Sequence, residues 1–430
     1  MRNLDMGRLW KITFLLSALL LLVSCQQTPP SPASACWQPP GAPLTAPLTS
    51  SKPAAPLGDF TKPHVPGEIL VKGDLSVSDW GQLGALSVEP VLKGWHRVLV
   101  PPGTEEETAR EALKKGALVA EPNYLARPLV QPNDPFYLSK QRSYLHGLMH
   151  LESVWDRERG DADLTIAVID SGYLDHPEIV SRLYLPAGVK LDTADEDTDP
   201  TDDTSNTAYS HGTEVMSALG AVTNNNAGIA GVTWQGKLLP IKVFPNGKDT
   251  ASVEDIAEAV IVAQEQGAKL VNLSLGFSGS SNLIEEQLKQ GWNKGTIFVA
   301  ASGNAGNQDV YYPAKSQYTI AVGAVDLSGV RAYFSNYGPE LDLVAPGVGI
   351  YLAYSTDGYG LGDGTSFAAP LATGAIALYM SAYKKRYGVW PSPNRVYSCA
   401  TQTAEDLGPR GRDEEYGSGL IRPDRMLSTP

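Results

Sequence analysis

Short apolar runs alternate with helix-like periods through the C-terminal two thirds of the chain. The runs are rich in β-branched residues and bounded by glycine or polar residues, as buried parallel strands are: 164–169, 238–243, 270–275, 296–301 and 320–325. Between two of them, Ser252 precedes a helical period that places Ile256, Val260 and Ala263 on one face. This alternation predicts an α/β fold, a doubly wound and mostly parallel sheet.

A second, smaller pattern precedes this one. Residues 67–72 alternate between apolar and polar side chains as an edge strand would. Thr104 and Glu107 have the spacing of a capping box, which predicts a helix from there through Lys115, and residues 117–120 predict another strand. We therefore expect a small α/β domain ahead of the large one.

The first residues have the pattern of an export signal. Basic residues precede an apolar stretch, 12–23, which is too short for an ordinary membrane-spanning helix. The stretch ends in Leu-Val-Ser-Cys, which resembles the box at which bacterial lipoproteins are cut and lipidated, here at Cys25. A lipid on Cys25 would anchor the chain to a membrane without a spanning helix. The alternative is a plain secretory signal with an incidental cysteine.

Residues 26–58 contain nine prolines among serine, threonine and alanine, which predicts an extended spacer. A chain of 430 residues also exceeds what a single core usually holds. The predicted organisation is a signal peptide at 1–24, a Pro-rich linker at 25–60, a small domain at 61–130 and a large domain at 131–430.

Charge and cysteine content narrow the classes of function. The net charge of −13 and the lack of any Lys/Arg run argue against nucleic acid as a partner. Three cysteines cannot form a disulfide framework; a bond between Cys36 and Cys399 is one option, and we expect two unpaired thiols instead.

Three motifs point to nucleophilic catalysis. Asp170 ends an apolar run, His211 opens a helical segment, and Ser366 lies between small residues at the start of another. A serine becomes a good nucleophile when a histidine takes its proton, and a carboxylate holds that histidine in the required orientation. Asp, His and Ser in this chain order form one of the known arrangements of such a triad.

The chain resembles the subtilisin-like serine proteases, in particular their thermitase-like branch. The resemblance covers about residues 133–427 and rests on the surroundings of Asp170, His211 and Ser366, together with the motifs at 271–276, 299–304 and 312–314. It implies a secreted serine endopeptidase that acts through an acyl-enzyme on peptide or protein substrates.

The resemblance also assigns the remainder of the site. It implies an oxyanion hole formed by the Asn304 side chain and the Ser366 backbone N–H. It further implies that an extended substrate pairs with the segment 274–276 and that the first substrate side chain lies against the segment 300–304. The substrate-binding residues are then Ser274, Leu275, Gly276, Ala301, Ser302 and Gly303.

The small domain resembles the inhibitory propeptides of the same family, many of which end near a sequence like the one at 121–124. The resemblance implies an intramolecular inhibitor that packs on helices of the protease, lays its tail in the active-site groove and is removed autocatalytically. We expect the cut within 126–133. An unrelated accessory domain is the alternative.

Two regions are candidates for structural calcium. Family positions of a calcium site correspond to Asp134, Glu178, Val222, Asn225, Ala227 and Ile229, although one residue is missing between Asp170 and Glu178. The acidic stretch 192–203, with seven carboxylates, is the second candidate, and a solvated acidic loop is its alternative.

Some positions depart from the family pattern. Glu214 and Leu371 replace common histidines, and Phe367 replaces the usual methionine after the serine. These departures are the only support for an alternative function, a non-catalytic relative that binds peptides at the cell envelope. An esterase or lipase would need a Gly-x-Ser-x-Gly elbow and another triad order.

Overall fold

The computed structural model describes residues 36–37, 57–125, 130–204 and 209–428. The predicted signal peptide and Cys25 lie outside these residues, as does most of the linker. Within the described residues, no helix has both the length and the apolarity that a membrane span requires.

The large domain is built on a six-stranded sheet in which every pairing is parallel, with the strand order β10-β9-β8-β7-β5-β6. The strands are β5 (Thr165–Asp170), β6 (Lys237–Lys242), β7 (Leu270–Leu273), β8 (Ile297–Ala301), β9 (Ile320–Val325) and β10 (Leu343–Pro346). Five of them match the predicted runs to within two residues at each end, and β10 was not predicted. The expected α/β fold with a doubly wound parallel sheet is confirmed.

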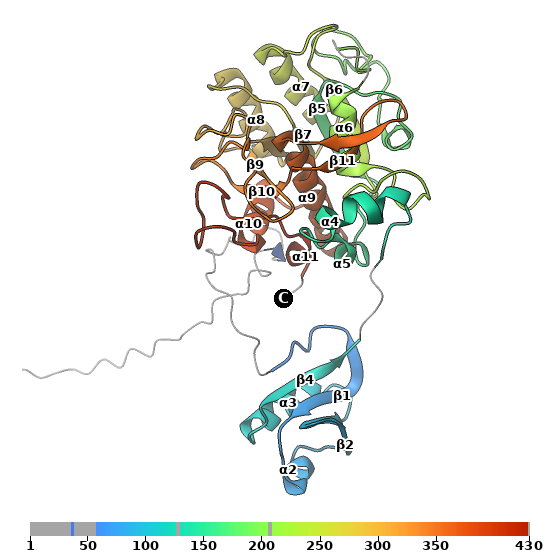
Figure 1. The fold of residues 1–430 in the computed structure, drawn as a ribbon, viewed down its shortest axis with the longest axis vertical. Helices are drawn as coiled ribbons and strands as arrows, with labels where there is room; N and C mark the ends of the chain where they lie inside the picture. Colours follow the sequence, from blue (N-terminus) through green and yellow to red (C-terminus); the bar gives the residue numbers. More distant parts are fainter. Residues whose placement is uncertain (1–35, 38–56, 126–129, 205–208, 429–430) are drawn as a thin grey trace, which may run out of the picture.

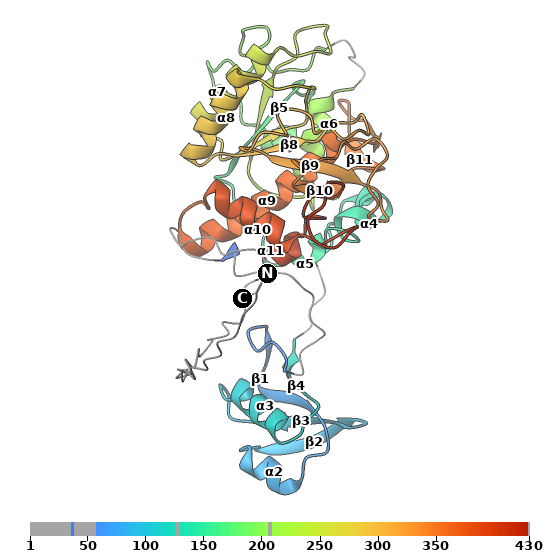
Figure 2. The same ribbon diagram turned by 90° about the vertical axis from the view of Figure 1, so that its left-hand side faces the viewer.

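Helices cover both faces of this sheet (Figures 1 and 2). On one face lie α6 (His211–Gly220) and α9 (Thr365–Tyr387), and on the other lie α7 (Val253–Glu265) and α8 (Asn282–Lys294). Two apolar cores result, one on each face. The predicted cap of α7 is present: the Ser252 hydroxyl accepts a hydrogen bond from the Asp255 N–H, and the Asp255 side chain accepts one from the Ser252 N–H.

Further elements complete the large domain around α9. A π-helical turn (Tyr137–Gln141) leads into α4 (Arg142–Leu145) and α5 (Leu151–Trp155), and a 3-10 turn follows at Val180–Arg182. The hairpin formed by β11 (Ile350–Ala353) and β12 (Tyr359–Gly362) precedes α9. The helices α10 (Pro393–Thr403) and α11 (Pro423–Met426) pack against α9.

The small domain is a four-stranded antiparallel sheet with two helices and its own core. Its elements are β1 (His64–Lys72), α2 (Val77–Gln82), β2 (Ser87–Leu92), β3 (Trp95–Leu99), α3 (Glu105–Lys114) and β4 (Val119–Tyr124). In both views it stands apart from the large domain (Figures 1 and 2). This arrangement therefore does not show the packing onto protease helices that the family resemblance implies.

Two details of the small domain differ from the sequence-based expectation. β1 is an interior strand, paired with both β3 and β4, and not an edge strand. Its alternation persists because only one face of the sheet is covered. The predicted capping box is also absent: the Thr104 hydroxyl donates to the Pro101 carbonyl at 2.7 Å and makes no cap bond to α3.

Candidate active site

A buried carboxylate and a histidine meet at the carboxyl end of β5. Asp170 is the last residue of that strand and is almost completely buried. His211 is the first residue of α6, whose N-terminus is capped by the Ser210 hydroxyl. The imidazole Nδ1 lies 2.7 Å from Asp170 Oδ1. Hydrogen bonding through Nδ1 leaves Nε2 as the nitrogen that can exchange a proton with a neighbouring group.

The charges around His211 favour its protonated form. Burial by itself lowers the histidine pKa, but the charge and hydrogen bond of Asp170 outweigh burial and raise the pKa to about 9. Glu214, one turn further along α6, adds a smaller contribution of the same sign. Burial raises the pKa of Glu214 itself to about 7.

Ser366 is the second residue of α9, and its backbone is fixed by an unusual contact. An α-helical N–H of residue 370 would bond to the carbonyl of residue 366, but Pro370 has no N–H. The Ser274 hydroxyl takes over this role and donates to the Ser366 carbonyl at 2.8 Å. Asn272 in turn donates to the Ser274 hydroxyl at 2.9 Å, so a polar chain from β7 holds the start of α9 in place.

The Ser366 hydroxyl donates to the Ser274 carbonyl at 3.3 Å. Within the described residues it forms no hydrogen bond with His211, whose ring centroid lies 5.8 Å from that of the adjacent Phe367. A hydroxyl has a single proton, so a bond to His211 requires rotation about the serine side chain. Such bonds often tighten only when substrate is bound.

Asn304 has a fixed orientation because of its partners. Its side-chain oxygen accepts hydrogen bonds from the Thr365 N–H at 2.9 Å and from the Thr365 hydroxyl at 2.8 Å. A backbone N–H can only donate, so the atom facing it must be the oxygen, and the amide NH₂ is left for another acceptor. This positioning role of Thr365 is not predicted by the sequence pattern.

A pocket of about 300 Å³ lies between the segments that carry Ser274, Asn304 and Ser366. Ser366, Asn304 and five of the six proposed substrate-binding residues contribute to its wall, together with Ala305, Tyr311 and Thr365. The exception is Ser302, which is completely buried and donates to the Asn336 carbonyl at 3.1 Å. Side chains alternate in an extended chain, so Ser302 points away from the pocket that Ala301 and Gly303 line. Ser302 is therefore not part of this pocket wall.

Gly303 could not be replaced without moving the pocket wall. Its φ of 107° belongs to the region that favours glycine. A Cβ atom at this position would also lie 2.4 Å from the Asn336 side chain and 2.9 Å from the Tyr311 ring. The glycine therefore allows the chain to pass close to Tyr311 just before Asn304.

The residues of the first calcium candidate converge, and Glu178 is among them although one residue is missing between it and Asp170. Asp134 accepts hydrogen bonds from the backbone of Asn224 and Asn225, and Glu178 Oε1 accepts from Ile229 N–H at 3.0 Å and from the Tyr359 hydroxyl at 2.8 Å. Val222 N–H donates to the Glu178 carbonyl, and Ala227 N–H donates to the Asn225 side-chain oxygen. Asp134, Glu178 and the segment 222–229 thus form one cluster.

This cluster has the properties of a cation site. Both carboxylates are buried, and burial raises the pKa of Asp134 and raises that of Glu178 to about 7. Glu178 Oε2 is buried without a hydrogen-bond partner. No group of three or more His, Cys, Asp or Glu side chains suited to a metal occurs in the described ranges. Calcium also accepts carbonyl and amide oxygens, so two carboxylates and a peptide loop fit it.

The second calcium candidate is occupied by a lysine. The fully buried Lys242 ammonium lies 2.7 Å from Asp192, 2.9 Å from Asp195 and 3.2 Å from Asp203. It also donates to the Asn246 side-chain oxygen at 3.0 Å. The protein thus supplies its own cation to three of the seven carboxylates, which favours the alternative to calcium in this stretch, an acidic loop.

A model of the subtilase family matches residues 161–419 of this chain, and these residues include Asp170, His211, Asn304 and Ser366. The chain belongs to the subtilase family. This match confirms the prediction of a serine-type endopeptidase, a hydrolase, and two relatives confirm the predicted thermitase branch.

Individual relatives agree with this assignment. The subtilase is 36% identical over 317 residues to a thermophilic serine proteinase of a Bacillus species, covering 72% of this chain and 74% of that protein. It is 34% identical over 282 residues to thermitase of Thermoactinomyces vulgaris, covering 65% of this chain and 94% of that one. A protease structure from Pseudoalteromonas arctica superimposes with a TM-score of 0.62 at 27% identity, over 69% of this chain and 99% of the other.

Proposed function

We propose that this subtilase cleaves peptide bonds through Ser366, His211 and Asp170. The Ser366 hydroxyl attacks the substrate carbonyl while His211 Nε2 takes its proton, and Asp170 orients the ring and stabilises its positive charge. His211 then gives the proton to the leaving amine, and an acyl-enzyme remains. Water, activated by the same histidine, releases the acid. The observation that carries the proposal is the hydrogen-bonded Asp170–His211 pair, whose imidazole centroid lies 5.8 Å from the ring centroid of Phe367, the residue that follows Ser366 of the pocket wall.

The Asn304 amide is proposed to donate to the oxyanion of the tetrahedral intermediate, with the Ser366 N–H as second donor. Thr365 holds the amide oxygen, so the NH₂ group is oriented before substrate arrives. We expect Asn304→Ala to lower kcat by about 100- to 1000-fold and to change KM little, because the bond forms mainly in the transition state.

Steady-state kinetics on a chromogenic peptide measure this effect. Asn307→Ala, at an exposed neighbouring position, is the matched control and should retain wild-type kcat. An Asn304→Ala variant with kcat within a factor of about three of wild type would remove Asn304 from the oxyanion hole.

Peptides are the substrate class, and we propose that they bind as an added strand along 274–276. The pocket beside this segment is formed mainly by small residues and by the Tyr311 ring, with Gly303 and Ala301 in its wall. Such walls favour apolar side chains of moderate size over charged ones, because a buried charge would have no partner.

The small domain is proposed to be an inhibitory propeptide that the enzyme removes from itself. Two features support this role: a compact domain immediately precedes the protease domain, and β4 ends at Tyr124, before the expected cut in 126–133. Incubated wild-type precursor should yield two fragments on reduced, denatured samples, whereas Ser366→Ala should stay intact. Equal processing of both would exclude self-cleavage.

Calcium at Asp134 and Glu178 is proposed to be structural. When bound, it would neutralise two buried carboxylates and link the segment 222–229 to the residues before the π-helical turn; it takes no part in proton transfer. We expect a chelator to lower the melting temperature by several degrees, on the order of 1–2 kcal/mol of stability.

Asp134→Asn is the control for the chelation experiment, because it should lower the melting temperature and abolish most of the effect of chelator. An equal shift in both proteins would place the ion elsewhere, and no shift in wild type would exclude a structural calcium.

We propose that the protein acts outside the cytoplasm and is anchored by lipid at Cys25. The support is the sequence at 22–25 and a relative from Natrialba magadii, 32% identical, that is described as an extracellular serine protease. Cys25→Ala should move the precursor from the membrane to the soluble fraction of expressing cells. Unchanged retention in the membrane would contradict the lipid anchor.

A further inference from the structure

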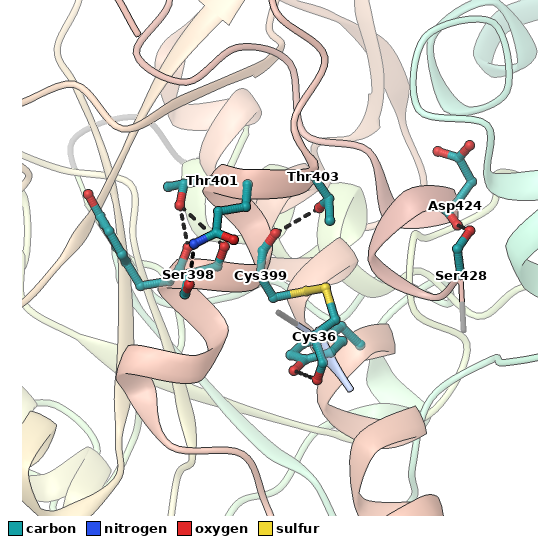
Figure 3. The surroundings of a disulfide bond; sticks show 10 residues. Cys36, Ser398, Cys399, Thr401, Thr403, Asp424 and Ser428 are labelled. Carbon is teal, nitrogen blue, oxygen red and sulfur yellow. Dashed lines mark hydrogen bonds between the residues drawn. A yellow bond between two sulfur atoms is a disulfide. The ribbon is translucent and has the colours of Figure 1, made fainter. Parts of the chain in front are cut away.

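Two residues of the Pro-rich segment are packed on the catalytic domain. Cys36 forms a disulfide with Cys399 of α10, across 363 residues of sequence (Figure 3). Cys36 is completely buried and Trp37 is nearly so. The expectation of two unpaired thiols was therefore wrong, because spacing along the chain does not reveal which distant helix a short segment packs against.

Specific contacts hold Cys36 and Trp37 on the catalytic domain. The Tyr379 hydroxyl donates to the Cys36 carbonyl at 2.7 Å, and the Tyr387 hydroxyl donates to the carbonyl of Trp37. The Trp37 ring makes an edge contact with Tyr379 and lies under the Arg386 guanidinium, whose carbon is 5.1 Å from the ring centre. Three residues of α9 thus bind the segment besides the disulfide from α10.

Cys36 and Cys399 lie on opposite sides of the expected maturation cut in the chain. Cys36 follows the proposed lipid site Cys25 and precedes the small domain at 57–125, whereas Cys399 lies in the catalytic domain. A maturation cut within 126–133 adds one water to one peptide bond and leaves a carboxylate and an amine. The S–S bond takes no part in that reaction.

We propose that the mature subtilase is a two-chain molecule, in which the Cys36–Cys399 disulfide keeps the N-terminal fragment on the catalytic domain after propeptide cleavage. This inference rests on the proposed maturation cut. The bond keeps residue 25 attached to the catalytic domain when the peptide link through the small domain is broken. An anchor placed before a removable propeptide would otherwise be lost at activation.

The retained fragment also carries the proposed inhibitor. A tethered small domain cannot diffuse away, so it stays at high effective concentration near the groove.

The test is the intact mass of processed full-length protein, alkylated and denatured before analysis so that thiols cannot exchange. Without reductant, the wild type should have the mass of the precursor plus one water. With a dithiol reductant, which supplies two electrons and two protons and becomes a disulfide itself, two fragments should appear. Cys36→Ser and Cys399→Ser should each give the two fragments without reductant.

A second arm makes the result independent of self-cleavage. In the Ser366→Ala precursor, residues 126–129 are replaced by the recognition sequence of a site-specific protease, and that protease makes the cut. A single unreduced species supports the tether even when the wild type fails to process itself. Fragments that separate without reductant, or a disulfide-linked species of twice the mass, would overturn it.

Discussion

Ser366→Ala should lower kcat for casein or a chromogenic peptide by about a million-fold, the magnitude that loss of the nucleophile reaches in subtilisin. The reason is that Ser366 supplies the atom that forms the acyl-enzyme. The neighbouring Thr365 hydroxyl cannot substitute for it, because that hydroxyl is bonded to the Asn304 side chain. The residual rate should come from the oxyanion donors and substrate binding alone.

Ser328→Ala is the matched control for this experiment. Ser328 is exposed and lies outside the pocket, so its loss should leave kcat unchanged. A Ser366→Ala enzyme that retained more than about one hundredth of wild-type kcat would contradict a role as nucleophile.

Asp170→Asn should lower kcat by about 10⁴-fold, a magnitude known from the corresponding change in a serine protease. The amide keeps the shape of the carboxylate, but it removes the charge that stabilises protonated His211 and can hold the ring in the wrong tautomer. Asp163→Asn, at an exposed ion pair with Lys384, serves as the control and should have little effect.

The same variant has an expected pH dependence. His211 must be neutral to accept the serine proton, and Asp170 raises its pKa to about 9, so wild-type kcat/KM should rise with pH through the neutral range toward that value. Removing the Asp170 charge lowers the pKa of His211. The residual activity of Asp170→Asn should therefore reach its plateau at a lower pH than wild type, and an unshifted profile would show that another group controls it.

The fold of the large domain, and the edge of the sheet at which Asp170 and Asn304 lie, could be predicted from the sequence. Buried parallel strands are continuous apolar runs, and carboxyl ends of such strands meet along one edge of the sheet. Asp170 ends β5 and Asn304 follows β8, so the pattern alone predicts that both lie along this edge of the sheet.

Contacts made between distant segments could not be predicted in the same way. Lys242 ends an ordinary strand, and only the fold brings it among the carboxylates of the acidic stretch. Ser302 lies in a family motif, yet side-chain alternation turns it from the pocket. The positioning roles of Thr365 and Ser274 arise only because the fold places their hydroxyls beside the Asn304 side chain and the Ser366 carbonyl.

The measurement that tests the central claim most directly is mass spectrometry of the wild-type protein after reaction with a fluorophosphonate, which labels activated serines. One label per chain is expected, on the peptide that contains Ser366, and labelling should abolish casein hydrolysis. His211→Ala should prevent labelling, because the hydroxyl then lacks its base. A fully folded protein that acquires no label at Ser366, or that hydrolyses casein with Ser366 fully labelled, would contradict the proposed mechanism.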